Sequence, residues 1–215
     1  PTHHLKIMTI PGDEMFNYSA NRELESSAKV KALEALLIEK GVISSSSVDK
    51  ILDYFETKMG PFNGAKLVAK AWKDTEFKSL LLKDCNAACE KLDMPTGMSG
   101  AEGEIMRVAE NTSSVHNLII CTLCSCYPWP TLGLPPYWFK DPTFRARSAR
   151  EPRVVLSEFG LDLNPEVEIR VWDSSGQIRW WVLPEQPSGT EHMTEEELAS
   201  LITPESMMGV SKVVL

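Results

Sequence analysis

The pattern of apolar positions divides the chain into a helical first part and a mixed second part. Between residues 21 and 91, apolar residues recur at helical spacing in several stretches, each separated from the next by Gly, Pro or a capping residue. Helices are expected to begin at Asn21, after a cap at Ser46 or Ser47, before Leu67, and after a cap at Asp74 or Thr75. Residues 1–95 are therefore expected to form an extended helical arm, whose apolar stripes contact a partner chain or the body of the molecule.

The second part, residues 96–215, combines short strands with short helices. Runs of apolar and β-branched residues predict strands over 105–108, 115–120, 166–172 and 178–183. The last two runs flank turn residues 173–176, so we expect them to pair as a β-hairpin. Helices are expected to begin after Asp141 and at Pro152, Thr194 and Pro204. The predicted fold class is α+β, with the arm followed by a compact, metal-binding catalytic body.

Three of the five cysteines, Cys121, Cys124 and Cys126, lie within six residues. We call residues 121–126 the claw loop. The apolar run 118–120 precedes it, and two prolines soon after it forbid regular structure, so the thiols are expected on a tight loop after a buried strand. Because the thiolate is the form that binds metal, crowding three of them together requires a cation or redox chemistry.

The number of donors distinguishes between metals. Structural zinc takes four ligands, and no fourth Cys or His follows the claw loop at the spacing of a zinc finger. The short run 124–126 instead suits a chelate in which the amide nitrogens of Ser125 and Cys126 also bind, which leaves one octahedral position open. Such strong, negative donors favour a low-spin trivalent ion, require nearby arginines and suit catalysis. The alternatives are a redox or structural thiol cluster, or a zinc site completed by another chain.

Composition narrows the function further. The chain has 215 residues, 43% of them hydrophobic, and a net charge of −8 with a pI of about 5.1. An acidic chain argues against nucleic acid as the main partner, because phosphate binding needs a basic face. No apolar run reaches the roughly 20 residues of a membrane span, and no basic-then-apolar leader opens the chain. We expect a cytoplasmic protein.

Two further groups of chemistry-bearing residues have simpler interpretations. Cys85 and Cys89 lie four residues apart on one helical face, and with no other ligand in view they are interpreted as small buried hydrophobes. His116 precedes the claw loop, and we interpret it as a hydrogen-bonded polar residue at the start of a strand. His3 and His4 are expected in a solvated terminus.

The run Cys-x-x-Cys-Ser-Cys followed by Tyr-Pro-Trp-Pro, residues 121–130, resembles the metal-binding signature of the nitrile hydratase alpha subunit. The resemblance continues through segments 64–72, 132–136, 150–153, 169–173 and 206–210. It implies one non-corrin Co(III) or non-haem Fe(III) per chain, bound by the three claw sulfurs and by the amides of Ser125 and Cys126. Thr122 and Tyr127 match the cobalt type, so Co(III) is expected and Fe(III) is the alternative.

The resemblance also implies roles for individual residues. Cys124 is expected as a sulfinic acid and Cys126 as a sulfenic acid, whose oxygen is a candidate nucleophile or base. Trp129 is expected to line the substrate pocket. Glu102 stands where the family commonly has Gln, and its carboxylate would change the charge of that pocket. Arg179 matches an arginine that bridges toward the partner subunit near the metal.

The function implied by the resemblance is the hydration of nitriles to amides, a lyase reaction. The implied partner is a beta subunit that supplies two arginines to the claw, in a heterodimer or heterotetramer. One alternative is the similar thiocyanate hydrolase gamma subunit, which has the same claw and a different substrate. Trp129 argues against it, because the thiocyanate relatives tend to have a basic residue there. The other alternative is a non-enzymatic thiol or zinc-binding module.

Overall fold

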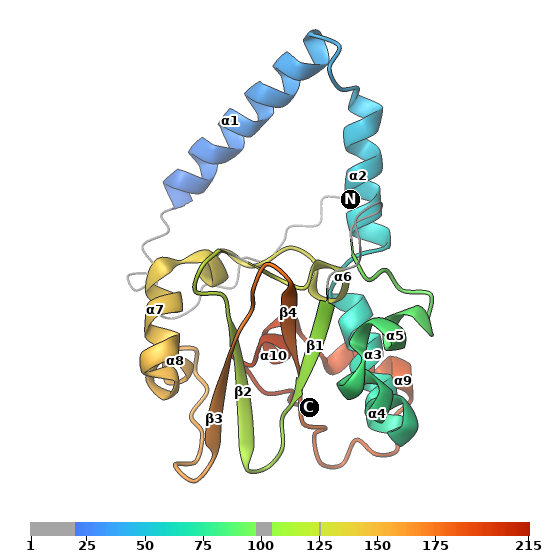
Figure 1. Ribbon diagram of the computed structural model, residues 1–215, viewed down its shortest axis with the longest axis vertical. Coiled ribbons are helices and arrows are strands. Elements are labelled where there is room, and N and C mark those ends of the chain that lie inside the picture. Colours follow the sequence, from blue (N-terminus) through green and yellow to red (C-terminus); the bar gives the residue numbers. More distant parts are fainter. Residues whose placement is uncertain (1–19, 98–104, 125) are drawn as a thin grey trace.

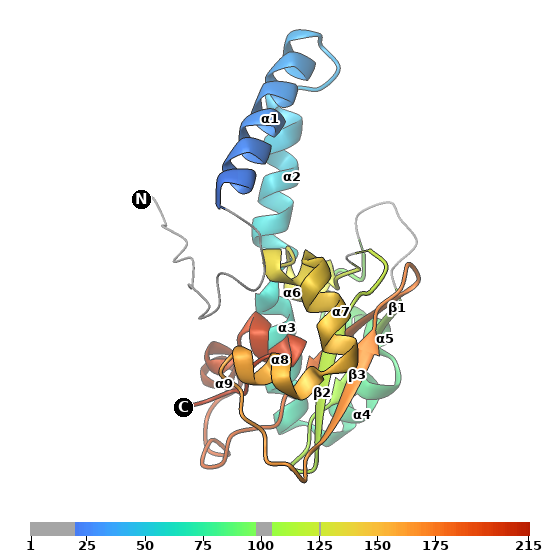
Figure 2. The same cartoon turned by 90° about the vertical axis from the view of Figure 1, so that its left-hand side faces the viewer.

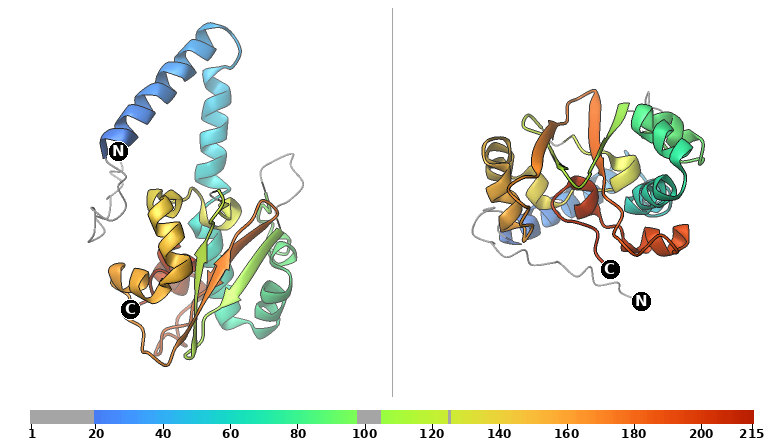
Figure 3. Two further views of the ribbon diagram at one scale, coloured as in Figure 1. Left: turned by 60° about the vertical axis from the view of Figure 1, so that its left-hand side comes forward. Right: turned by 90° about the horizontal axis from the view of Figure 1, so that it is seen from below.

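Two helices, α1 (Ala20–Glu39) and α2 (Ser45–Thr57), project from the rest of the chain (Figure 1). The structure is a computed structural model that describes residues 20–97, 105–124 and 126–215. Large apolar side chains on this pair face solvent, among them Val30, Leu33, Leu36, Ile51 and Leu52. The views in Figures 2 and 3 agree that the two helices stand apart from the strands. The extended helical arm predicted from the sequence is confirmed for these two helices.

The N-cap of α2 lies two or three residues before the predicted one. Ser44, rather than Ser46 or Ser47, has the extended backbone of an N-cap, and its Oγ accepts a hydrogen bond from the Ser47 amide at 3.1 Å. Four consecutive serines follow Val42 and Ile43, so the residue types alone do not fix which one caps the helix. Ser44, the first of the four, is the N-cap, and the helix begins at Ser45.

The next three helices belong to the body, and two of them pack against a strand. α3 (Pro61–Lys73) has a buried face and contacts α9 (Glu195–Leu201), while α4 (Thr75–Lys83) and α5 (Cys85–Glu90) contact β1 (Ile105–Glu110). Asp84 ends the expected fourth helix and caps α5 by accepting from the Ala87 amide. Cys85 and Cys89 are buried in the core, which confirms their interpretation as small hydrophobes. The division of the chain at residue 95 stays a prediction.

The described strands form two parallel pairs. β1 pairs with β4 (Ile178–Leu183), and β2 (Val115–Ile120) pairs with β3 (Glu168–Asp173). Helices α7 (Pro142–Arg150) and α8 (Pro152–Glu158) lie beside the β2–β3 pair, and α3 to α5 lie beside the β1–β4 pair (Figure 1). α10 (Pro204–Met208) packs between them, as the view from below in Figure 3 shows. The predicted α+β class is confirmed.

The predicted hairpin of residues 166–183 is wrong, because its two strands belong to different pairs. The Ser174 amide donates to the Ile120 carbonyl at 2.8 Å, which extends the β2–β3 ladder by one residue beyond Asp173. The Ser174 hydroxyl then accepts from the Trp180 amide at 3.0 Å. The chain therefore crosses from one pair to the other instead of reversing alongside β3.

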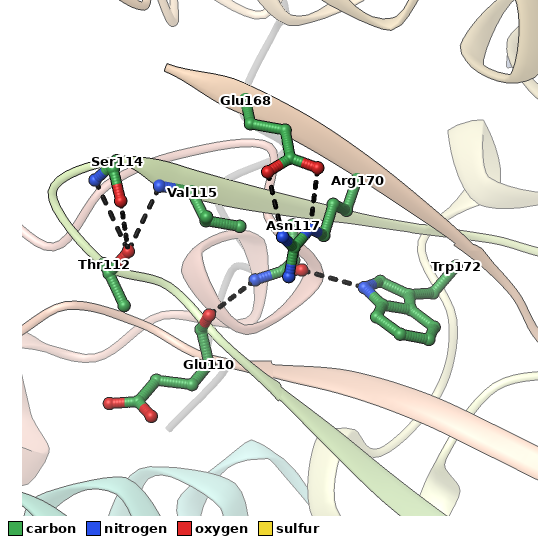
Figure 4. A network of polar contacts seen from close by, with 8 residues as sticks. All are labelled: Glu110, Thr112, Ser114, Val115, Asn117, Glu168, Arg170 and Trp172. Carbon is green, nitrogen blue, oxygen red and sulfur yellow. Dashed lines mark hydrogen bonds and ion pairs between the residues drawn. The ribbon is translucent and has the colours of Figure 1, made fainter.

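A buried asparagine joins the two pairs (Figure 4). The Asn117 side-chain amide donates to the Glu110 carbonyl at 2.7 Å, and its oxygen accepts from the Trp172 indole at 2.8 Å. The Trp172 ring stacks on Trp180 with 4.2 Å between ring centroids. Because a buried amide is stable only when its polar atoms are paired, these contacts fix the end of β1 against β2 and β3.

Short helices complete the body. The claw loop leads into α6 (Trp129–Leu132), and the 3₁₀ helix η1 (Tyr137–Lys140) precedes α7. Four aromatic rings from η1, α7 and the end of α8 pack edge to face and form a cluster under α7: Trp138, Phe139, Phe144 and Phe159. Among the described helices, none combines the length and the hydropathy that crossing a membrane requires.

His116 ties β2 to the segment after α10. The ring is buried, its Nε2 donates to the Gly209 carbonyl at 2.7 Å, and its Nδ1 accepts from the Asn111 amide at 3.3 Å. This neutral tautomer satisfies both ring nitrogens, and burial lowers the pKa of His116. The interpretation of His116 as a hydrogen-bonded residue at a strand start is confirmed.

Replacing Gly209 with alanine is expected to destabilise the fold more than replacing Gly160. Both glycines have a φ of +82°, a left-handed conformation that costs an L-residue about 1–2 kcal/mol. A Cβ on Gly209 would also lie 1.9 Å from the Asn117 carbonyl oxygen, whereas a Cβ on Gly160 has no atom within 4 Å. We expect losses of about 1 kcal/mol for Gly160→Ala and about 3 kcal/mol for Gly209→Ala in urea unfolding. Equal losses would contradict the close approach of Gly209 to β2.

Candidate metal centre

The claw loop begins where β2 ends, and its three thiols converge. The Sγ atoms of Cys121 and Cys124 lie 3.4 Å apart, those of Cys124 and Cys126 lie 2.7 Å apart, and all three lie within 4.8 Å of one another. Cys121 and Cys126 are buried, whereas Cys124 is exposed. The three sulfurs, none of which is in a disulfide, can therefore share one ion that remains open to the outside on the Cys124 side.

A carboxylate at the end of β3 holds the start of the claw loop. Asp173 accepts from the Thr122 amide through Oδ1 at 2.9 Å and from the Thr122 hydroxyl through Oδ2 at 2.5 Å. Asp173 lies opposite Ile120 in the parallel register, so its side chain reaches the residue after Cys121. In the sequence pattern Asp173 opens the turn residues 173–176, which gives it no role at the claw loop. Only the parallel pairing of β2 and β3 reveals its contact with the claw loop.

Aromatic residues fix the other end of the claw loop. Tyr127 is fully buried, with its ring 5.2 Å from that of Phe139, and burial raises the pKa of its hydroxyl. Trp129 begins α6, and its half-buried ring meets the edge of Phe55 from α2 at 5.7 Å. The predicted pocket-lining role of Trp129 stays a prediction. The structure adds that this ring links the claw loop to the arm.

The charge of Arg179 acts on Cys126 of the claw loop. It lies on β4, and its guanidinium donates to the Ser175 carbonyl. Burial and the hydrogen bond with Cys124 raise the pKa of the Cys126 thiol to about 12, and the positive charge of Arg179 opposes that rise. At neutral pH the metal-free site therefore holds a proton on Cys126, which a metal must displace on binding.

The arginines of the α7–α8 region divide into three groups. Arg147 forms ion pairs with Glu151 and Glu158. Arg153 donates to the carbonyls of Leu163, Asn164 and Val167, a structural role in holding a loop. Arg145 and Arg150 instead line a cavity of about 330 Å³ together with Thr122 of the claw loop. Their contacts therefore give these arginines different roles, although they are close in the sequence.

The donor set fits a soft or trivalent metal ion that thiolates prefer. Within the described residues, no His or carboxylate joins the three cysteines, so a tetrahedral zinc site would need a ligand from elsewhere. Ser125 and Glu102 lie outside the described residues. The amide ligands at Ser125 and Cys126 and the pocket role of Glu102 therefore stay predictions.

Comparisons with known proteins agree with this donor set. The family model for the nitrile hydratase alpha chain matches residues 24–211. The low-molecular weight cobalt-containing nitrile hydratase subunit alpha of Rhodococcus rhodochrous is 54% identical over 187 residues, 87% of this chain and 88% of that protein. The thiocyanate hydrolase subunit gamma of Thiobacillus thioparus is 40% identical over 84% of this chain and 76% of that protein.

The fold is also found in solved structures. A double mutant of the Fe-type nitrile hydratase from Comamonas testosteroni Ni1 superposes with a TM-score of 0.79 at 41% sequence identity. The match covers 91% of this chain and 92% of that chain. The likeness therefore includes the arm and the body as well as the residues around the claw loop.

Proposed function

Because the chain belongs to the family of nitrile hydratase alpha chains, we propose that it is the metal-carrying subunit of an enzyme that hydrates nitriles to amides. The observation that carries this proposal is the convergence of three claw sulfurs within 4.8 Å, with one of them facing the outside. The exposed side gives a small nitrile access to the site. The buried side keeps the donors in place.

The metal in this proposal is Co(III), with Fe(III) as the alternative. The named relative at 54% identity contains cobalt, and the solved structure at 41% identity is of the Fe type. Cys121, Cys124 and Cys126 would bind the ion by sulfur, and Ser125 and Cys126 would add amide nitrogens. The bound ion supplies Lewis acidity. The positive charge of Arg179 opposes the excess negative charge of these donors.

The partner in this proposal is a beta subunit, in an alpha–beta heterodimer or a heterotetramer of two such pairs. The two arm helices support it, because their exposed apolar side chains need a partner to remove them from water. We also propose a cytoplasmic location for the enzyme.

Changing the apolar face of α1 is expected to weaken the association with the beta subunit. Leu33 and Leu36 are 57% and 45% exposed in the chain alone, so replacing both with Asp leaves the fold of the body intact. If the beta subunit covers them, each charge opposes burial, and we expect association to weaken at least about 100-fold, measured by analytical ultracentrifugation. The matched control is Leu134→Asp, which changes an exposed leucine of the body. Unchanged association of the α1 variant would contradict the proposed role of the arm.

The function is tested on the chain co-expressed with its beta subunit. We expect one cobalt per alpha chain, added oxygen on Cys124 and Cys126 by intact mass, and turnover of acrylonitrile to acrylamide. One iron with the same oxygens would keep the function and change the metal. Turnover of thiocyanate alone would transfer the chain to the second candidate, which its 40% identical relative represents. Zinc with unoxidised thiols would support the non-enzymatic module.

A further inference from the structure

One face of α7 forms a positively charged cavity beside the claw loop. Pro142, Ala146 and Arg150 recur at four-residue spacing, as do Arg145 and Ala149, so these residues share one side of the helix. Two small alanines and two arginines of α7 therefore line the cavity. Thr122 completes the cavity, whose volume is about 330 Å³. We call it the α7 cavity.

Among the described residues, no carboxylate pairs with the two arginines of the α7 cavity. None of its described lining residues is acidic, and neither Arg145 nor Arg150 forms an ion pair there. The Nε atom of Arg145 is buried and has no hydrogen-bond acceptor in the described structure. Arg147, on the same helix, differs from both, because its guanidinium donates to the carboxylates of Glu151 and Glu158.

A buried guanidinium N–H without an acceptor is costly, so this arrangement indicates an acceptor from outside the chain. Paired N–H groups of a guanidinium fit the two oxygens of a carboxylate. The chain as a whole carries a net charge of −8, whereas the two arginines make this cavity locally positive. The cavity is large enough for an Asp or Glu side chain to enter.

We propose that the α7 cavity receives a carboxylate side chain of the beta subunit. This inference rests on the proposed function, because it uses the same partner. Thr122 borders the cavity and donates to Asp173, so a side chain that docks there also contacts the start of the claw loop. The partner is then positioned against the metal centre by an ion pair that is separate from the claw ligands and from the arm.

The test compares the association of alpha variants with the wild-type beta subunit. The double variant Arg145→Gln and Arg150→Gln removes both charges and keeps shorter, polar side chains. We expect the Kd for the beta subunit to rise at least about 30-fold, with a weaker dependence of the Kd on salt. The control is Arg170→Gln, whose guanidinium pairs with Glu168 on the exposed side of β3 and does not line the α7 cavity.

Charge exchange identifies the docking carboxylate. In the alpha variant Arg145→Glu and Arg150→Glu, we expect one Asp→Lys or Glu→Lys change in the beta subunit to restore association. Circular dichroism of each alpha variant alone shows whether the fold is retained. If the wild-type chains associate and the folded Gln variant binds equally well, the α7 cavity proposal is overturned and the proposed function stands. If the wild-type chains do not associate, the proposed function itself fails.

Discussion

Replacing Cys121 with alanine is expected to reduce the cobalt content of the assembled protein to background. Cys121 is the buried sulfur at the end of β2, and its Sγ lies 3.4 Å from that of Cys124. The remaining two thiols cannot enclose an ion on the inner side of the site. We expect a loss of metal affinity that exceeds the about 10–100-fold seen when only a supporting hydrogen bond is removed. Metal analysis of the purified alpha–beta complex measures it.

The matched control for this variant is Cys89→Ala. Cys89 is as buried as Cys121, but it lies on α5 in the core and outside the claw loop. Its replacement is expected to cost about 1 kcal/mol of stability and to leave one cobalt per chain. Loss of cobalt from both variants to the same extent would mean that general destabilisation, and not the missing donor, empties the site.

Replacing Asp173 with alanine is expected to weaken metal binding about 10–100-fold without removing any metal ligand. The carboxylate accepts from both the amide and the hydroxyl of Thr122, and no other described residue holds that part of the claw loop by hydrogen bonds. Without this carboxylate, the claw loop becomes ordered only when the metal binds. The conformational entropy lost in this ordering weakens metal binding. A cobalt competition titration with a chelator of known affinity measures the change.

Thr122→Val separates the two contacts of Asp173. This variant loses the hydroxyl donor and keeps the backbone amide, so its effect on cobalt affinity should lie between the wild type and Asp173→Ala. If Asp173→Ala binds cobalt as tightly as the wild type, the claw loop keeps its shape without the β3 carboxylate, and the positioning role is wrong.

The local elements of the fold follow from the sequence because their signals are local. β2 coincides with its predicted run of 115–120, and Thr194 forms the capping box expected from the acidic residues after it. The pairing of the strands does not follow from the sequence. The turn residues between β3 and β4 fit a hairpin equally well, whereas the parallel pairs depend on contacts between segments about 50 to 70 residues apart.

At the metal site too, features that are local in the sequence are predictable, whereas contacts between distant segments are not. The three claw cysteines are close in sequence, so their convergence was predictable from spacing. Asp173 reaches Thr122 only through the register of β2 with β3, and Arg145 borders the same threonine only because α7 packs beside the end of β2. Residues that support the claw from other elements are therefore found in three dimensions and not in the sequence.

If a beta subunit covers the arm as proposed, the contact between Phe55 and Trp129 links the subunit interface to the claw loop. Phe55 belongs to the arm, and Trp129 follows the last claw cysteine by three residues, with the two rings 5.7 Å apart. A beta subunit that fixes α2 thereby favours one arrangement of the claw loop. Thermodynamic reciprocity then requires that a bound metal tighten subunit association by the same factor by which association tightens metal binding. An alpha chain without its metal should accordingly bind its partner with a higher Kd than a loaded one.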